Sequence, residues 1–190
     1  MFPEDNPRMT LQLLQDKLGE LRPTEISEAE RKVLLGQARE LVKFLEKPEE
    51  VVFRQSFETH TYNFSIRIAV DLGIFHVLVE RLGEPVGPAE LGALCGAQEL
   101  LIVRIMRVLT ALDYAAESTE CEYVANSFSR ACTLPHIEAY ILHTFENAAR
   151  VTNRMPEYFK EHGYESPENG TKGPFQYAQN TSLAYFDYLH

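Results

Sequence analysis

Apolar side chains recur at steps of three and four residues along most of the chain, which is the spacing of one face of an α-helix. Near the N-terminus this pattern predicts a short helix over residues 10–21, which Pro23 cannot continue. Ser27 followed by Glu30 has the spacing of a capping box and predicts the start of a second helix, which Pro48 ends. The first 48 residues are therefore expected to form a helical arm.

A longer amphipathic helix is predicted over residues 50–72, because Phe57, Phe64 and Ile68 share one apolar face. Gly73 follows it and suits the left-handed conformation in which many helices end. The apolar face fits either a core or a dimer interface. Residues 74–82 predict a further short helix.

The most specific local pattern is a helix-turn-helix followed by two strands. Gly87 and Pro88 suit the start of a helix over residues 89–94, and a turn then leads to a longer helix over residues 98–112. Tyrosine and valine flank a loop of turn-forming residues after it, which predicts a two-strand wing at residues 114–117 and 121–124. The expected fold class is mainly α: a winged helix with a helical N-terminal arm and a small two-strand wing.

Beyond the wing the pattern is again helical. Pro135 begins a predicted helix that runs to about Arg154, and residues 156–162 predict another. A loop rich in glycine, proline and asparagine then leads to a last amphipathic stretch at residues 178–189. We therefore divide the chain into an arm, residues 1–48, and a domain, residues 49–190.

Composition and charge narrow the classes of function. The 190 residues are 45% hydrophobic, which is enough for one domain with a core, and a net charge of -10 disfavours nucleic acid and anionic lipid as partners. The sequence lacks both a signal peptide and the run of about 18 uncharged apolar residues that a membrane span needs. Cys95, Cys121 and Cys132 lack the spacing of a zinc site or a disulfide framework, so we expect reduced, buried thiols. We predict a cytoplasmic protein whose partners are small molecules and other proteins.

Six longer stretches of the sequence carry information beyond helical periodicity. They are EKPEEVVFRQSFE, IRIAVDLGIFHVL, PAELGALCGAQELLIVRIMRVLTAL, YVANSFSRACT, YFKEHGYESPENGTKGPFQYAQNT and LAYFDYL. In this order they resemble the dimerisation domain of the plant and fungal S-adenosylmethionine-dependent O-methyltransferase family. The resemblance covers nearly the whole chain after about Leu41, and GPFQYAQNT is its most discriminating part. It implies a mostly helical domain that forms an intertwined homodimer and closes one side of a substrate pocket.

The same family binds its cofactor in a Rossmann-like domain, through a glycine-rich loop and an acidic residue. None of the ten glycines of this chain forms GxG, and no alternation of strands and helices predicts a doubly wound sheet. We therefore expect no cofactor, and no methyl transfer by this chain alone. No cluster of histidine, aspartate or glutamate has the spacing of metal ligands, so we also expect no metal.

The predicted helix after Pro135 carries the candidate chemistry. Hydrogen-bonding or ionisable side chains recur along it at steps of four and three, namely His136, Tyr140, His143, Asn147, Arg150 and Arg154. An ordinary solvated helix face gives the same pattern, but the resemblance favours a functional one because the matching family helix lines the substrate cleft. A histidine there can donate a hydrogen bond or act as acid or base near neutral pH. We assign catalysis to His143 first, then to His136 and Tyr140, and substrate binding to Asn147, Arg150, Arg154, Phe175 and Tyr177.

Three functions compete. The favoured hypothesis is an enzyme without methyltransferase activity, a cofactor-independent cyclase or isomerase that acts on a small intermediate of fungal secondary metabolism, with pericyclic reactions included. The alternative is a catalytically silent dimerisation or accessory module, either pairing with another methyltransferase-like chain or being the N-terminal domain of a longer O-methyltransferase. A winged-helix DNA binder ranks last, since Arg104 and Arg107 on the would-be recognition helix are balanced by Glu99 and Asp113.

Overall fold

A computed structural model describes residues 26–189. The chain divides between Arg54 and Gln55 into two compact units, whereas the sequence placed the end of the arm at residue 48. The helix predicted for residues 10–21 lies outside the described residues. Among residues 26–189 no single helix is long and apolar enough to cross a membrane, and only the bent pair Pro48–Asp71 and Ile74–Glu80 meets those criteria in combination.

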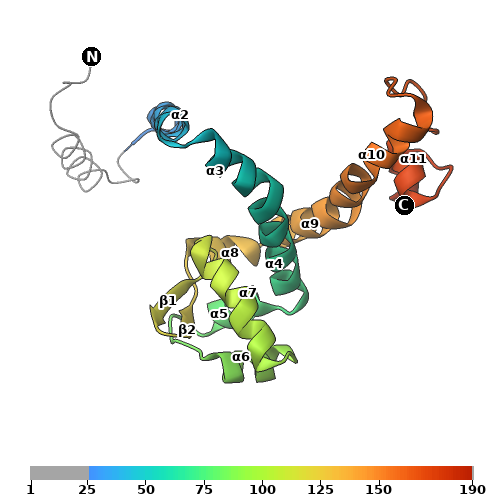
Figure 1. Cartoon of the computed structure of the whole chain (residues 1–190). Helices are drawn as coiled ribbons and strands as arrows, with labels where there is room; N and C mark the ends of the chain where they lie inside the picture. The colour runs from blue at the N-terminus through green and yellow to red at the C-terminus, as the bar shows by residue number, and fades with distance from the viewer. Residues whose placement is uncertain (1–25, 190) are drawn as a thin grey trace, which may run out of the picture. The chain divides into compact units, whose positions relative to one another are not determined.

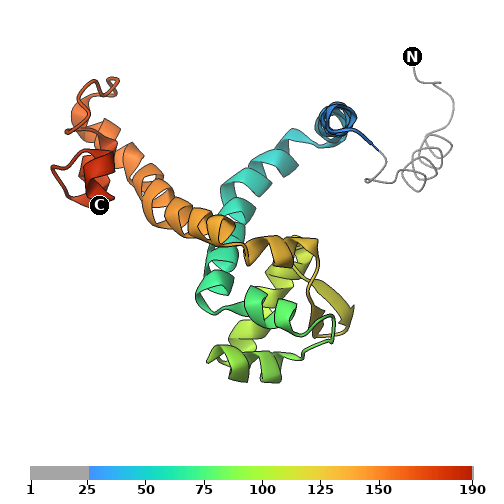
Figure 2. The same ribbon diagram turned by 180° about the vertical axis from the view of Figure 1, so that it is seen from behind.

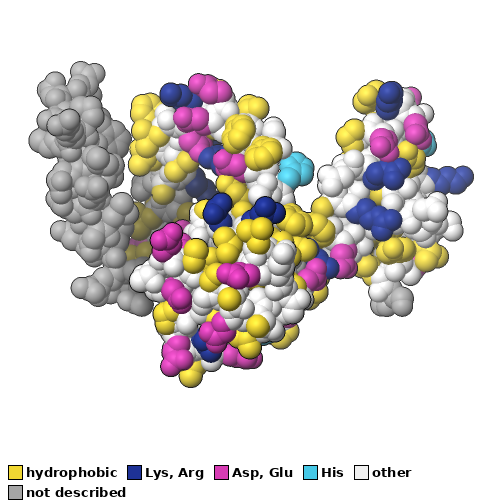
Figure 3. Space-filling model, turned by 60° about the horizontal axis from the view of Figure 1, so that its bottom comes forward, with side chains coloured by type: hydrophobic (Ala, Val, Ile, Leu, Met, Phe, Trp, Pro, Cys, Tyr) yellow, Lys and Arg dark blue, Asp and Glu magenta, His cyan; other side chains and the backbone are white. Residues whose placement is uncertain are grey.

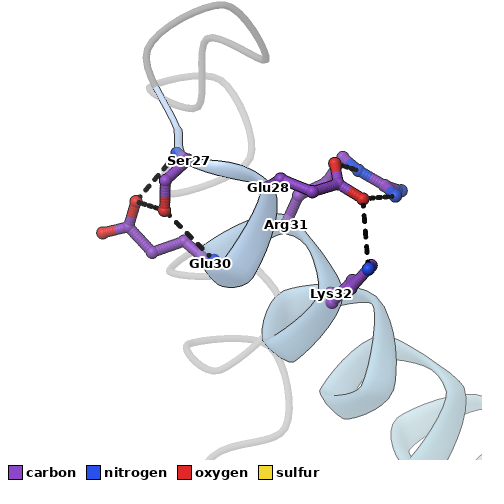
Figure 4. A network of polar contacts seen from close by, with 5 residues as sticks. All are labelled: Ser27, Glu28, Glu30, Arg31 and Lys32. Carbon is purple, nitrogen blue, oxygen red and sulfur yellow. Dashed lines mark hydrogen bonds and ion pairs between the residues drawn. The ribbon is translucent and has the colours of Figure 1, made fainter.

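The first unit contains helices α2 (Glu28–Leu45) and α3 (Pro48–Phe53). Figure 4 shows the predicted capping box at the start of α2: the Glu30 backbone N–H donates to Ser27 Oγ at 3.3 Å, and the Ser27 backbone N–H donates to the Glu30 carboxylate at 2.8 Å. Glu28 forms ion pairs with Arg31 and Lys32 in the same turn. No residue of α2 is buried, although several are apolar. The capping box confirms the predicted start of this helix.

The predicted helix over residues 50–72 is helical throughout but not uniform. A π-helical turn, η1 (Arg54–Glu58), lies between α3 and helix α4 (Thr59–Asp71). Gly73 adopts the expected left-handed conformation, with φ of +67°, and helix α5 (Ile74–Glu80) follows. The π-helical turn was not predicted, because periodicity over a short window does not distinguish a turn with one added residue.

The core of the second unit lies among α4, α5, the helix-turn-helix and the wing (Figure 1). The turn joins α6 (Pro88–Cys95) to α7 (Glu99–Ala111), and the wing pairs β1 (Ala116–Thr119) with β2 (Glu122–Val124) in antiparallel fashion. Helix α8 (Ser127–Cys132) follows the wing. Burial at its end raises the pKa of the Cys132 thiol to about 11. The side chains at its centre are Ile74, Phe75, Leu78, Leu91, Ile102, Met106 and Leu109. The predicted fold class, mainly α with a small wing, is confirmed.

The C-terminal part differs from the prediction in two places. Helix α9 (Pro135–His143) continues through a π-helical turn, η2 (Thr144–Ala149), into α10 (Arg150–His162) (Figure 2). The predicted break at Pro156 is wrong: proline removes one backbone hydrogen bond, yet α10 extends past it to the buried Tyr158, which packs beside α11.

The predicted amphipathic stretch at residues 178–189 is also wrong as a single element. The structure forms α11 (Pro174–Gln179) and α12 (Tyr185–Tyr188) instead. Asn180 separates them because it adopts a left-handed conformation, with φ of +51°, which ends a helix.

The helix-turn-helix depends on the missing side chain at Gly92. A Cβ atom there would lie 2.7 Å from the backbone carbonyl oxygen of Ala97, in the turn between α6 and α7. Gly92→Ala should therefore lower the free energy of unfolding by about 1–3 kcal/mol, as overpacking does, when measured by urea denaturation. Gly36→Ala is the control, since Gly36 is helical and a Cβ atom added to it would meet no other atom within 4 Å. Equal stability of the Gly92→Ala and Gly36→Ala variants would contradict the steric argument.

Candidate functional site

The C-terminal segment packs onto α10 and brings side chains from distant parts of the sequence together. Its anchor is Gln176, which is 7% exposed and uses its whole amide. Gln176 Oε1 accepts from the Gly173 backbone N–H at 3.0 Å, while Nε2 donates to the carbonyl oxygens of Gly170, at 3.0 Å, and Leu183, at 2.8 Å. One buried side chain therefore joins the loop before α11 to the segment before α12.

His143 lies at the centre of a chain of four hydrogen-bonded side chains. Gln179 Nε2 donates to Asn147 Oδ1 at 3.3 Å, Asn147 Nδ2 lies 3.3 Å from His143 Nδ1, and His143 Nε2 lies 2.6 Å from the Tyr185 hydroxyl. The rings of His143 and Tyr185 meet edge to face at 79°. Residues from α9, η2, α11 and α12 thus form one polar chain.

The direction of this chain follows from hydrogen-bonding chemistry. Because Asn147 accepts from Gln179 through its oxygen, its amide nitrogen faces His143, and an amide nitrogen only donates. With the two amides placed in this way, His143 Nδ1 is the acceptor, and a neutral ring carries its proton on Nε2. That N–H donates to the Tyr185 oxygen, which leaves the proton of the Tyr185 hydroxyl free to donate.

Two open grooves flank α10. One, of about 280 Å³, is lined by Asn147, Ala148, Val151, Thr152, Phe175 and Tyr185. The other, of about 560 Å³, is lined by Arg150, Arg154, Gln176, Tyr177, Ala178, Asn180, Thr181 and Ser182. Figure 3 shows lysine and arginine side chains grouped on this C-terminal part of the surface. The first groove is mostly apolar with an uncharged lining, and the second is basic.

The structure separates the residues that the sequence placed on one stripe. His143, Asn147 and Phe175 belong to the hydrogen-bonded chain or to the apolar groove, whereas Arg150, Arg154 and Tyr177 line the basic groove. His136 and Tyr140 line neither groove and are exposed, Tyr140 by 69%. The π-helical turn explains why Arg150 and Arg154 leave the side of His143, because one added residue rotates every following side chain by about 100° around the helix axis.

In the basic groove, packing against an aromatic ring fixes the position of Arg154. Arg154 lies over the Tyr177 ring, 5.2 Å from its centroid, and pairs with Glu157 at 2.7 Å. Both Tyr177 and Glu157 raise the pKa of the Arg154 guanidinium, so it stays charged. The Tyr177 hydroxyl donates to Glu161 at 2.9 Å, which fixes the aromatic ring beside Arg154.

The described residues do not fit S-adenosylmethionine or a metal ion. The strands in the part of the chain that the structure describes form a two-stranded antiparallel sheet, which cannot supply the strand, glycine loop and helix that hold this cofactor in doubly wound folds. Within residues 26–189 no three histidine, cysteine, aspartate or glutamate side chains are grouped as metal ligands. We therefore derive no chemical step through either.

Comparison with known proteins identifies relatives of the chain. No family model matches it. It is 32% identical over 159 residues to the O-methyltransferase penC of Penicillium thymicola, covering 84% of this chain and 39% of penC. It is 28% identical over 151 residues to the O-methyltransferase lepI of Aspergillus flavus, covering 80% of this chain and 38% of lepI. The chain is homologous to fungal O-methyltransferases.

A solved structure shares the fold. The chain superposes on a pericyclic reaction enzyme with a TM-score of 0.82 and 25% identity, over 96% of this chain and 46% of that one. The curated relatives are longer, and the chain spans about two fifths of their length. The resemblance to the helical domain of this family, which the sequence predicted, is confirmed for the homologous region.

Sequence reasoning missed two members of the hydrogen-bonded chain, Tyr185 and Gln179. Both lie in strings that carry the family resemblance, LAYFDYL and GPFQYAQNT, so the signal for their importance was present. Their partners were not predictable, because His143 and Tyr185 are 42 residues apart and belong to different helices. The assigned roles of all eight predicted site residues stay predictions.

The anchoring role of Gln176 can be measured. Gln176→Leu leaves the carbonyl oxygens of Gly170 and Leu183 without this donor, at a cost of about 1–3 kcal/mol for each unsatisfied group. Limited proteolysis should then cut residues 164–189 faster than in the wild type. Gln98→Leu is the control, because Gln98 is exposed and makes no capping hydrogen bond through its side chain. An unchanged cleavage rate in Gln176→Leu would show that the segment is held by other contacts.

Proposed function

We propose that the chain binds a small natural-product intermediate and accelerates its cyclisation or isomerisation without methylating it. The observation that carries the proposal is the oriented chain from Gln179 to Tyr185, which ends at an apolar groove. A homologue whose solved structure is a pericyclic reaction enzyme supports the reaction class. The chain spans about two fifths of the length of these relatives, so we propose the activity and do not transfer it from them.

The arrangement suits a reaction that needs orientation and one polarised bond. Apolar walls fold a flexible substrate into a reactive shape, and holding reacting atoms close can lower a barrier by several kcal/mol. A preorganised donor on the wall of an apolar groove stabilises negative charge that develops on a substrate oxygen. Val151 and Phe175 provide walls, and the chain through His143 provides the donor.

A silent accessory module is the second candidate, and the exposed apolar side chains of α2 favour it. Phe44 is 84% exposed and Val33 60%, and none of the residues of this helix is buried within the chain. Large exposed apolar surfaces mark sites of association. We propose that the chain forms a homodimer under both candidate functions. As an accessory module it could instead pair with another methyltransferase-like chain.

The enzymatic proposal is tested with the intermediates made by neighbouring biosynthetic genes. His143→Ala should lower the turnover number by about a hundredfold, because the donor that faces developing charge on the substrate loses the side chain that orients it. Product formation is followed by mass spectrometry. His60→Ala is the control, because His60 is exposed on α4 and outside both grooves. Wild-type turnover in His143→Ala would remove His143 from the mechanism, whereas no turnover by the wild type or either variant favours the accessory module.

The dimer is tested on α2. Light scattering at micromolar concentration should give the mass of two chains for the wild type, and Phe44→Glu should shift the mass toward one chain because it places a charge in an apolar interface. Phe44 is too exposed within the chain for its loss to disturb the helix itself. Arg39→Glu is the control and should remain dimeric, because Arg39 is exposed and lies about 140° from Phe44 around the axis of the same helix. A monomeric wild type would refute the dimer.

A further inference from the structure

We propose that the hydroxyl of Tyr185, rather than the imidazole of His143, is the group that contacts the ligand, and that the ligand is a neutral apolar molecule with a carbonyl. This inference takes the location of the site from the proposed function and names the substrate class that the site accepts. His143 is then a positioning residue, which acts through Tyr185.

Both ring nitrogens of His143 are already used within the protein. Nδ1 accepts from Asn147, and Nε2 donates to the Tyr185 oxygen at 2.6 Å. A ligand could therefore reach the imidazole only by displacing one of these partners. The Tyr185 hydroxyl has accepted one hydrogen bond and keeps its own proton, which makes it the end of the chain that is free to donate.

The surroundings of Tyr185 indicate what it would contact. Ala148, Val151 and Phe175 give the groove of about 280 Å³ its apolar walls, and none of its lining side chains is charged. The Thr152 hydroxyl donates to the backbone carbonyl oxygens of Ala148 and Ala149 instead of facing a ligand. Uncharged donors on apolar walls match a neutral molecule with a strong acceptor, such as a ketone, and not an anion.

The direction of the Tyr185 hydroxyl is fixed from two sides. Phe175 packs against the Tyr185 ring at 5.0 Å and 79°, and His143 holds the oxygen. A hydroxyl held in this way has less freedom to lose on binding, which strengthens its hydrogen bond to a ligand. Accepting a hydrogen bond from His143 also polarises the O–H bond, because hydrogen bonds in a chain strengthen one another.

The inference is tested by binding, with two probes that differ only in the carbonyl. 1-Tetralone and tetralin have nearly the same shape, and ligand-observed NMR gives the dissociation constant of each for the full chain. The wild type should bind 1-tetralone about three- to tenfold more tightly than tetralin, the range for one net hydrogen bond. Equal affinities, or no saturable binding of either probe, would overturn the inference.

Two tyrosines on α12 provide a matched comparison. Tyr185→Phe should abolish the preference for 1-tetralone and leave tetralin binding unchanged, since only the hydroxyl is removed. Tyr188→Phe should keep the preference, because Tyr188 packs on the same Phe175 ring but lies outside the lining of the apolar groove. Circular dichroism checks that both variants fold. A preference that survives in Tyr185→Phe overturns the inference.

Asn147→Asp tests the direction of the hydrogen bonds that run from Gln179 to Tyr185. A carboxylate only accepts, so Nδ1 of the neutral ring must carry the proton, and Nε2 then takes the hydrogen bond from the Tyr185 hydroxyl. At about pH 9, above the ordinary titration range of histidine, nitrogen-15 NMR should show the proton of His143 on Nε2 in the wild type and on Nδ1 in the variant. The preference for 1-tetralone should disappear with it.

The readouts separate this inference from the proposed function. A preference that is retained in Asn147→Asp, with the ring proton moved, shows that Tyr185 does not depend on His143 and overturns its positioning role. Absence of turnover with any intermediate would end the enzymatic proposal, yet it would leave the probe affinities and the NMR result of the inference unchanged.

Discussion

The buried amide of Gln176 is the interaction on which the C-terminal site depends. Its three hydrogen bonds hold the loop at Gly170, the start of α11 and the segment before α12 together. A buried amide that left these groups unpaired would be costly, so the segment has few alternatives to its observed path. Phe175 and Tyr177 flank Gln176 in sequence, and each lines a different groove beside α10. Gln176 therefore helps to position side chains of both grooves.

The second constraint is the π-helical turn η2. In a regular helix the polar residues between His136 and Arg154 would share one face. The added residue in η2 turns Arg150 and Arg154 away from the side of His143 and Asn147. Such turns occur often at functional sites because they redirect side chains without ending the helix. The result here is one groove without charge and one with two arginines.

The chain can be homologous to fungal O-methyltransferases and still act on a substrate without transferring a methyl group. The matched region amounts to about two fifths of penC and lepI, and the residues that the structure describes do not fit S-adenosylmethionine. A helical domain can still hold a substrate, orient it and donate one hydrogen bond. The fold by itself assigns no reaction, so the argument for function rests on the oriented side chains between Gln179 and Tyr185.

The sequence alone determined most of the helices, the capping box at Ser27, the left-handed Gly73 and the mainly α fold, because each depends on residues close together in the chain. It also indicated His143 and Asn147, four residues apart on one helix face. Tertiary structure decided the rest. Tyr185 meets His143 only when α12 folds back toward α9, and periodicity carries no information on contacts across 42 residues. The division of the polar residues between two grooves was equally hidden, since helical periodicity does not show the shift from α-helical to π-helical bonding in η2.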